Sequence, residues 1–279
     1  MNSIPILDNH MHIDLRGRGM NAVKDFRNAG GTHIILVSKP SWTLGIHIRQ
    51  PPDYVKIFDE TINIAHQATE MGIKAFPVLG VHPAEITQLT TRMELDEAVE
   101  TMKGGLDIAS GYVKQGSAVG IKSGRPHYPV SEYIWDASNE IMEHAFQIAA
   151  DLDCAVQLHT ESVGEEQLTD IAARAKECGT NLHRVVKHFS PPLIEICNDK
   201  GIFPSVIASK NSIETAIAQG DRFMMETDYI DDPERPGAVL GPKTVPRRTL
   251  KLVEKHGEDI FWKIHKENPE KVYDIQIEL

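Results

Sequence analysis

In Ile4-Pro5-Ile6-Leu7-Asp8-Asn9-His10-Met11-His12, an apolar run leads directly into two histidines that are one residue apart. The run is typical of a short buried strand, and side chains at positions i and i+2 of a strand point to the same side. His10 and His12 would therefore leave the strand end side by side, with Met11 turned to the opposite face. Two neutral imidazoles on one rigid edge are a good start for a divalent-metal site.

Short apolar runs alternate with longer amphipathic segments over the whole chain. The first strand lies within residues 4–12, and further strands are expected at 33–38, 74–81, 118–122, 155–159, 184–188, 203–208 and 223–228. Helices are expected between them. Three begin at the capping sequences Thr91-x-x-Glu94, Ser162-x-x-Glu165 and Asn211 with Glu214, and a long one begins at Ser131 or Glu132. Eight strands alternating with helices over 279 residues favour an α/β fold, a (β/α)8 TIM barrel forming one domain over residues 1–279. A doubly wound open sheet uses the same alternation and is the alternative.

The composition limits the classes of partner. The net charge of −11 weighs against sequence-independent binding of nucleic-acid phosphates, but it does not exclude a local basic pocket. The three cysteines, Cys154, Cys178 and Cys197, form no disulfide framework, so we expect a reducing, cytoplasmic location. No apolar run is long enough to span a bilayer and the amino terminus lacks signal-peptide features, so no membrane partner is expected. The sequence indicates no particular oligomeric state.

Polar residues with metal-binding or substrate-binding chemistry stand at the ends of the expected strands. In a (β/α)8 barrel the active site lies at these carboxyl ends. The residues are His10, His12, His82, Lys122, His159, His188 and Asp228. A lone strand-end histidine is more often a structural hydrogen-bonding residue, so the prediction of a metal site depends on convergence of the set. His47 and His127 lie in loops on the same side and are more simply interpreted as solvated residues than as substrate contacts.

The chain resembles the TatD-type family of metal-dependent hydrolases, within the amidohydrolase superfamily. The resemblance covers nearly the whole chain and rests on Asp8-Asn9-His10-Met11-His12, Gly80-Val81-His82-Pro83, Gln157-Leu158-His159, Lys187-His188-Phe189-Ser190 and Met225-Glu226-Thr227-Asp228. It implies a set of metal ligands consisting of His10, His12, His159, His188 and Asp228. It also implies that Asp228 is the general base.

One stretch departs from this family. A metal-bridging glutamate usually ends strand four in a Gly-Glu-Ile-Gly-like sequence, but here the stretch is Ala118-Val119-Gly120-Ile121-Lys122-Ser123-Gly124. It is similar to the fourth strand of phosphotriesterase-like relatives, whose lysine is carboxylated by carbon dioxide and bridges two metals. We therefore expect Lys122 to be a carbamylated metal bridge. The alternatives are a free lysine that binds a substrate oxyanion beside one metal, and a solvent-exposed lysine.

The ligand chemistry indicates which cofactor and mechanism to expect. Mixed histidine and aspartate ligation suits one or two divalent ions, with zinc preferred and manganese, iron or magnesium as alternatives. The cation would lower the pKa of a bound water from about 15.7 to about 7. Asp228 would then orient that water and take its proton.

The walls of the site are expected to bind substrate through His82, Arg125 and Lys39. A basic pocket for a phosphate or carboxylate could be formed by Lys39, Trp42, Arg49, Arg125 and Arg235, although each charge taken singly is more simply interpreted as solvated. The loop at residues 229–246 is long enough to be a lid.

The sequence therefore predicts a hydrolase that cleaves an ester-type bond, a phosphoester or phosphodiester, in a small-molecule or nucleotide-type substrate. Nucleic acid is not favoured, because the charge is acidic and few aromatic residues are available to stack on bases. The alternatives are a small-molecule lactonase or amidohydrolase with a carbamylated Lys122, and a metal-binding protein without catalytic activity.

Overall fold

The computed structural model describes residues 4–232, 234–235, 237 and 239–279. Within this part of the chain, nine parallel strands form one sheet in the order β8-β7-β6-β5-β4-β3-β2-β1-β9. Their bounds are β1 (Leu7–His12), β2 (His33–Val37), β3 (Lys74–Gly80), β4 (Gly120–Gly124), β5 (Ala155–His159), β6 (Val185–Ser190), β7 (Phe203–Ile207), β8 (Met224–Glu226) and β9 (Tyr229–Ile230).

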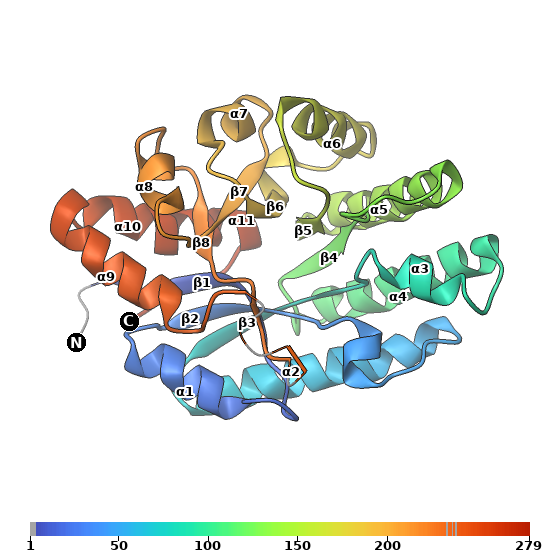
Figure 1. The fold of residues 1–279 in the computed structure, drawn as a ribbon, viewed down its shortest axis with the longest axis horizontal. Coiled ribbons are helices and arrows are strands. Elements are labelled where there is room, and N and C mark those ends of the chain that lie inside the picture. The colour runs from blue at the N-terminus through green and yellow to red at the C-terminus, as the bar shows by residue number, and fades with distance from the viewer. Residues whose placement is uncertain (1–3, 233, 236, 238) are drawn as a thin grey trace.

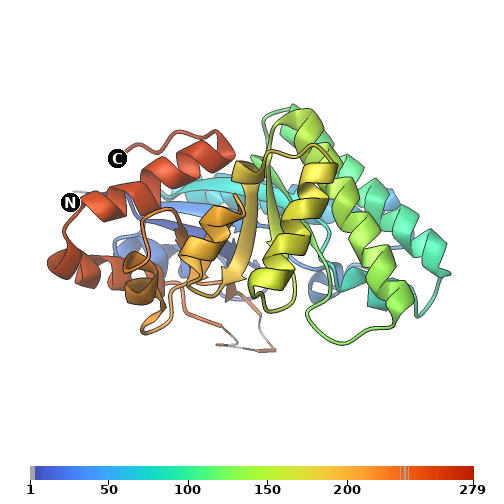
Figure 2. The same ribbon diagram turned by 90° about the horizontal axis from the view of Figure 1, so that it is seen from above.

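Helices surround the curved sheet on its outside (Figures 1 and 2). They are α1 (Met20–Asn28), α2 (Val55–Glu70), α3 (Glu85–Leu89), α4 (Leu95–Lys114), α5 (Glu132–Leu152), α6 (Glu165–Glu177), α7 (Ile194–Asp199), α8 (Ser212–Ile217), α9 (Thr244–His256), α10 (Asp259–Trp262) and α11 (Asn268–Tyr273). Short 3-10 segments are η1 (Ser41–Leu44), η2 (Pro51–Tyr54) and η3 (Leu182–Arg184), and η4 (Lys263–Glu267) is a π-helix. No helix of the described residues is long and apolar enough to cross a membrane.

The sheet closes on itself because the eighth strand position is shared by two short strands. β8 pairs with β7, and β9, which is separated from β8 by two residues, pairs with β1. Between them, the Asp8 carboxylate accepts hydrogen bonds from the backbone N–H of Thr227 at 3.0 Å and from the Thr227 hydroxyl at 2.7 Å. The Asp8 side chain thus connects β1 to Thr227, which lies between β8 and β9. The predicted (β/α)8 barrel is confirmed, and the open-sheet alternative is wrong.

Alternation along the strands divides the core into an inner and an outer layer. On β2, Ile34 and Leu36 pack against α1 and α2, whereas Ile35 and Val37 face the barrel interior. The interior cluster also contains Tyr273 from the carboxyl-terminal segment. The apolar filling leaves the carboxyl ends of the strands for polar side chains.

Several helix starts differ from the predicted ones. Helix α4 begins at Leu95, and the Thr91 hydroxyl donates to Gln88 O at 2.7 Å, so Thr91 and Glu94 form no capping box. The short helix α3 before it was not predicted. In contrast, the Ser131 hydroxyl accepts from Ile134 N at 3.4 Å and caps α5, which confirms that prediction.

The predicted capping box at Ser162 is also wrong. The amino-terminal cap of α6 is Gly164, whose N–H donates to Gln167 Oε1 at 2.9 Å. Helix ends fray and vary by one or two residues, so local sequence determines such boundaries only weakly.

Candidate active site

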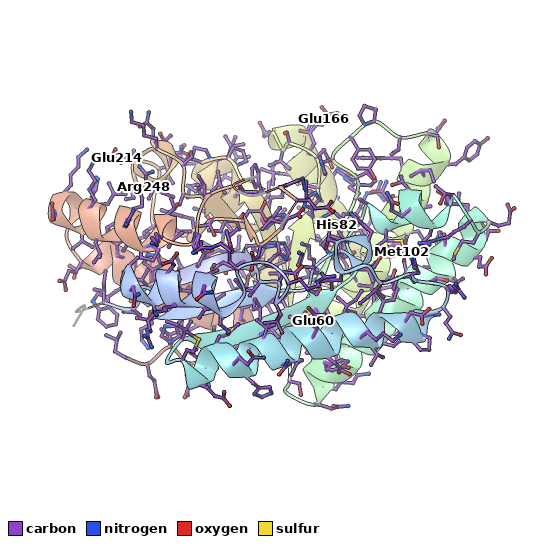
Figure 3. The ribbon with its side chains drawn as sticks, turned by 60° about the horizontal axis from the view of Figure 1, so that its bottom comes forward. Glu60, His82, Met102, Glu166, Glu214 and Arg248 are labelled. Atoms are coloured by element: carbon purple, nitrogen blue, oxygen red, sulfur yellow. The ribbon has the colours of Figure 1, made fainter. Side chains whose placement is uncertain are left out.

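A cavity of about 1620 Å³ opens at the carboxyl ends of the strands. Its lining includes residues on or just after β1, β3, β4, β5, β6 and β8, namely His12, His82, Lys122, His159, His188 and Asp228. The chain folds this way because parallel strands in a barrel all point their carboxyl ends at one rim. Figure 3 shows His82 beside η1, where its ring makes an edge contact with Trp42 at a centroid separation of 5.6 Å.

The first three ligand candidates meet around one small volume. His10 Nε2 and His12 Nε2 lie 3.1 Å apart, and Asp228 Oδ1 lies 3.8 Å from the first and 3.9 Å from the second. All three side chains are buried, and their ligand atoms fall within 4.8 Å of one another. The structure therefore brings together residues separated by more than two hundred positions in the chain.

The hydrogen-bond partners of the two imidazoles determine their tautomers. Gln157 Nε2 donates to Asn9 O at 3.0 Å, so its Oε1 faces His10 Nδ1 at 2.6 Å and accepts from that ring. His12 Nδ1 likewise lies 2.8 Å from the carbonyl oxygen of Val37 and donates to it. Both Nε2 atoms then carry lone pairs that face each other across 3.1 Å. Two lone pairs at this separation repel unless a cation lies near both. The Lys122 amine lies 3.4 Å and 3.5 Å from the two Nε2 atoms, and with Asp228 beside them the same donor set also fits a metal ion.

A second pair of imidazoles lies beside the first. The rings of His10 and His188 stack at a centroid separation of 3.9 Å, and His188 Nε2 lies 2.9 Å from His159 Nδ1. The other nitrogen of His188 lies 3.1 Å from Glu226 Oε1. His159 Nε2 lies 2.8 Å from His127 Nδ1, so the loop residue His127 contacts the site.

The imidazoles at the centre are held in the neutral form that binds metals. Burial lowers the pKa of His10, His12, His159 and His188 well below its ordinary value. The positive charge of nearby Lys122 lowers the pKa of each further.

Lys122 points into the centre. Its Nζ lies 3.4 Å from His10 Nε2 and 3.5 Å from His12 Nε2, and the side chain is 1% exposed. Burial lowers the pKa of this amine to about 8, while Asp228 and Glu226 oppose the shift. The alternative of a solvent-exposed lysine is therefore wrong.

Asp228 lies in the two-residue interval between β8 and β9 and lines the cavity. Its backbone has a φ of 47°, a left-handed conformation that aspartate tolerates better than most residues. Burial raises the pKa of Asp228 to about 7, and Lys122 and Lys187 oppose this shift.

Sequence reasoning missed the role of Glu226. Its carboxylate is fully buried beneath His188 and accepts from Phe189 N at 2.7 Å and from the hydroxyl of Ser205. Ser205 in turn accepts from Asn9 Nδ2 at 2.9 Å. This network orients the His188 ring through its Nδ1 atom. The Glu-Thr-Asp sequence at 226–228 was the available signal.

The expected substrate residues have three different outcomes. His82 and Lys39 line the cavity, but Lys39 Nζ donates to Asp14 Oδ2 at 2.7 Å and to Asp231 O at 2.9 Å. Arg125 is not among the residues that line the cavity. Its guanidinium binds carboxylates of Glu161 and Asp170 and the side-chain oxygen of Asn139, and it lies over the ring of Trp135.

The expected basic pocket is therefore not formed by these residues. Arg235 lines the cavity, but its Nε donates to Asp232 at 2.8 Å, and Arg49 does not line the cavity. Instead, the walls carry two exposed aromatic side chains, Trp42 at 39% and Phe189 at 47%. The predicted lid contains Asp228's neighbours Ile230, Asp232, Glu234 and Arg235 at the cavity wall, and residues 233, 236 and 238 lie outside the described part of the chain.

Comparison with known proteins finds one sequence relative and several similar folds over nearly the whole chain. An uncharacterized protein of Methanocaldococcus jannaschii is 43% identical over 285 residues, covering 100% of this chain and 99% of that protein. The TatD homologue YjjV of Escherichia coli has a similar fold, with 16% identity, a TM-score of 0.67, and coverage of 97% of this chain and 98% of that one. A mutant PTE-like lactonase from Deinococcus radiodurans has 13% identity, a TM-score of 0.61, and coverage of 97% and 96%.

The family is decided by the sequence match itself. Residues 7–274 match the family described as TatD related DNase, and this range includes every strand and all the clustered histidines. The chain therefore belongs to the TatD-related DNase family and is a metal-dependent hydrolase.

Proposed function

We propose that this protein hydrolyses a phosphoester bond at a divalent-metal site formed by His10, His12, Lys122, His159, His188 and Asp228. The observation that carries the proposal is the pair of Nε2 lone pairs 3.1 Å apart, with Asp228 Oδ1 less than 4 Å from both. A general base and a cation-binding donor set thus share one cavity, which is the arrangement that metal-assisted hydrolysis requires.

The mixed imidazole and carboxylate donor set suits zinc, with manganese, iron or magnesium as alternatives. When bound, a divalent cation lowers the pKa of a coordinated water and polarises the scissile phosphoryl or carbonyl oxygen. His10 and His12 would hold one ion with Asp228, and His159 and His188 would hold a second.

Lys122 would complete this site as a carbamate. Its neutral amine would attack carbon dioxide, forming the N–C bond and releasing one proton, so that an ammonium donor becomes an oxygen ligand. Support comes from its position: an unmodified ammonium 3.4 Å and 3.5 Å from two metal-binding nitrogens would repel the cation. The alternative role, a free lysine that binds the substrate oxyanion, has the same distances in its favour.

Asp228 acts as the general base. Its carboxylate lies in the cavity wall, 8% exposed, and its position between β8 and β9 aims it at the two Nε2 atoms. It would orient the attacking water, accept its proton, and return the proton to the leaving oxygen.

For the substrate, we propose a small or nucleotide-type phosphoester. The family supports phosphoester chemistry. Lys39 and Arg235, two basic side chains in the wall, are paired with Asp14 and Asp232, which weakens the case for a nucleic-acid backbone. A lactonase or amidohydrolase is the second candidate, supported by the strand-four lysine and by the fold shared with a PTE-like lactonase. We further propose a cytoplasmic location with no membrane partner.

The test is a release assay on protein loaded with zinc or manganese. The panel contains a phosphomonoester, a phosphodiester, single-stranded DNA and a lactone, and elemental analysis gives the metal content. Asp228→Asn should lower kcat about 10²- to 10⁴-fold, the range for loss of a general base. Lys122→Ala should lower the metal content if Lys122 is a ligand, and leave it unchanged if it binds only substrate.

A non-catalytic metal-binding protein is the remaining alternative. It would be favoured if wild-type protein cleaved nothing in the panel while retaining metal. It would also be favoured if Asp228→Asn and wild type behaved identically in every assay.

A further inference from the structure

Lys187 is a buried cation that neither the fold nor the mechanism above uses. It precedes His188 on β6, is 2% exposed, and lines the cavity. Its Nζ donates to the carbonyl oxygen of His188 at 2.5 Å. Among the described residues, no carboxylate lies within ion-pair distance of this amine.

Lys39 has the carboxylate partner that Lys187 lacks. Lys39 is also buried and lines the cavity, but its ammonium binds the Asp14 carboxylate and the carbonyl oxygen of Asp231. An ammonium has three N–H donors, and within the described chain Lys187 uses one of them, on a neutral acceptor. Burial lowers the pKa of Lys187 to about 8, and the charges of Glu226, Glu161 and Asp228 oppose this shift from beyond ion-pair distance. A buried ammonium without a carboxylate in direct contact is costly, so such a residue is expected to have a ligand.

The backbone around Lys187 is irregular. The pairing of β6 with β7 shifts between Lys187 and Ser190, and Phe189 has a φ of 51°. A strand that alternated regularly would turn Lys187 away from the side that His188 occupies. Both side chains nevertheless line the cavity, and irregularities of this kind re-aim side chains next to active sites.

We propose that Lys187 binds a negatively charged oxygen of the substrate beside the metal site. This deepens the proposed function and rests on it: the substrate would carry its own anionic group, a phosphate or a carboxylate, next to the scissile bond. A neutral triester or lactone would leave the buried ammonium unpaired, and sites with unpaired buried polar groups discriminate strongly against such analogues. Lys187 would therefore favour an anionic phosphoester over the lactone alternative.

The experiment compares Lys187→Met with wild type, with Lys187→Arg as the conservative variant. Lys251→Met is the control, because it removes the same charge from an exposed position of α9 that does not line the cavity. Binding of inorganic phosphate and of acetate is measured by titration calorimetry on metal-loaded and metal-free protein. Kinetics are measured with 4-nitrophenyl phosphate and with the neutral ester 4-nitrophenyl acetate, and Tm is recorded for every variant.

Lys187→Met should weaken binding of the anion about 10- to 100-fold and raise KM for 4-nitrophenyl phosphate similarly, the effect of losing one charge-assisted hydrogen bond. KM for the neutral ester should be unchanged, Lys187→Arg should retain part of the affinity, and Tm should stay equal or rise, because a buried charge has been removed. Preferential loss of phosphate binding identifies a phosphate group, and preferential loss of acetate binding identifies a carboxylate.

Equal anion affinity in Lys187→Met and wild type would overturn the proposal. So would a fall in Tm with equal losses on both esters, since that pattern belongs to a structural lysine. If metal-loaded wild type cleaves neither these esters nor any substrate of the panel above, the proposed function fails, but the anion titrations still decide the role of Lys187.

Discussion

At the scale of single residues, the site depends on side chains that hold the ligands as much as on the ligands. His10 and His12 could be predicted because they follow an apolar run with a spacing of two. Gln157 could not be assigned a role in advance. Its amide reaches His10 on β1 and the hydroxyl of Tyr273 near the carboxyl terminus, contacts between residues more than a hundred positions apart.

Gln157→Leu tests this positioning role. Without its Oε1, His10 Nδ1 has no acceptor, and the ring is free to turn its Nε2 away from the centre. Metal affinity should fall about 10- to 100-fold, the usual effect of losing a hydrogen bond to a metal-binding imidazole. Chelator competition measures the affinity, and Gln115→Leu on the exposed end of α4 is the control. Unchanged affinity in Gln157→Leu would show that packing alone orients His10.

At the scale of elements, the strands were predicted more accurately than their irregularities. The register of β1 against β2 shifts between Asp8 and Met11, an interval that contains His10. The eighth strand is broken into β8 and β9, and the break places Asp228. Local sequence contains little information on such breaks, because they are determined by pairing with strands that are distant in the chain.

The close approach of β3 and β4 at the metal site gives a prediction for Gly80. A Cβ added to Gly80 would lie 2.0 Å from the backbone oxygen of Lys122, so Gly80→Ala must push the strands apart where Lys122 enters the centre. We expect a lower Tm and weaker metal binding.

Gly111→Ala is the matched control, because a Cβ there has no neighbour within 4 Å on helix α4. It should stabilise the protein by about 0.5–1 kcal/mol through helix propensity. Thermal unfolding of both variants checks the contrast, and equal Tm changes would mean that the strand contact is not constraining.

At the scale of the whole molecule, the carboxyl-terminal segment is hydrogen-bonded to the first strand. His265 on η4 is fully buried, with Nδ1 3.0 Å from Leu7 O and Nε2 2.8 Å from the hydroxyl of Thr249 on α9. Burial lowers the pKa of His265 from 6.5 to about 3.

This pKa predicts how stability depends on pH. Between pH 6.5 and 3, His265 binds a proton in the unfolded chain but not in the folded protein. Its contribution to the free energy of unfolding is therefore complete above pH 6.5 and is lost as the pH falls toward 3. Protonation linked to His265 should lower the free energy of unfolding by about 2–3 kcal/mol between pH 7 and pH 4.5. Denaturant unfolding at both pH values checks it, with His265→Asn as the comparison. An equal loss in the variant would assign the acid sensitivity to other groups.

The sequence by itself determined the barrel and most of the candidate ligands, because strand alternation and parallel connections force polar strand ends to one rim. Only the tertiary structure decided which charges are free and which are paired. Arg125 and Lys39 had the right chemistry for an anion pocket, yet Glu161 and Asp14 neutralise them. Lys187 was quoted in the sequence only as part of the stretch 187–190 and received no role, yet it is buried and has no carboxylate within ion-pair distance among the described residues. Pairing of charges depends on distances between remote segments, and one chain's sequence does not contain these distances.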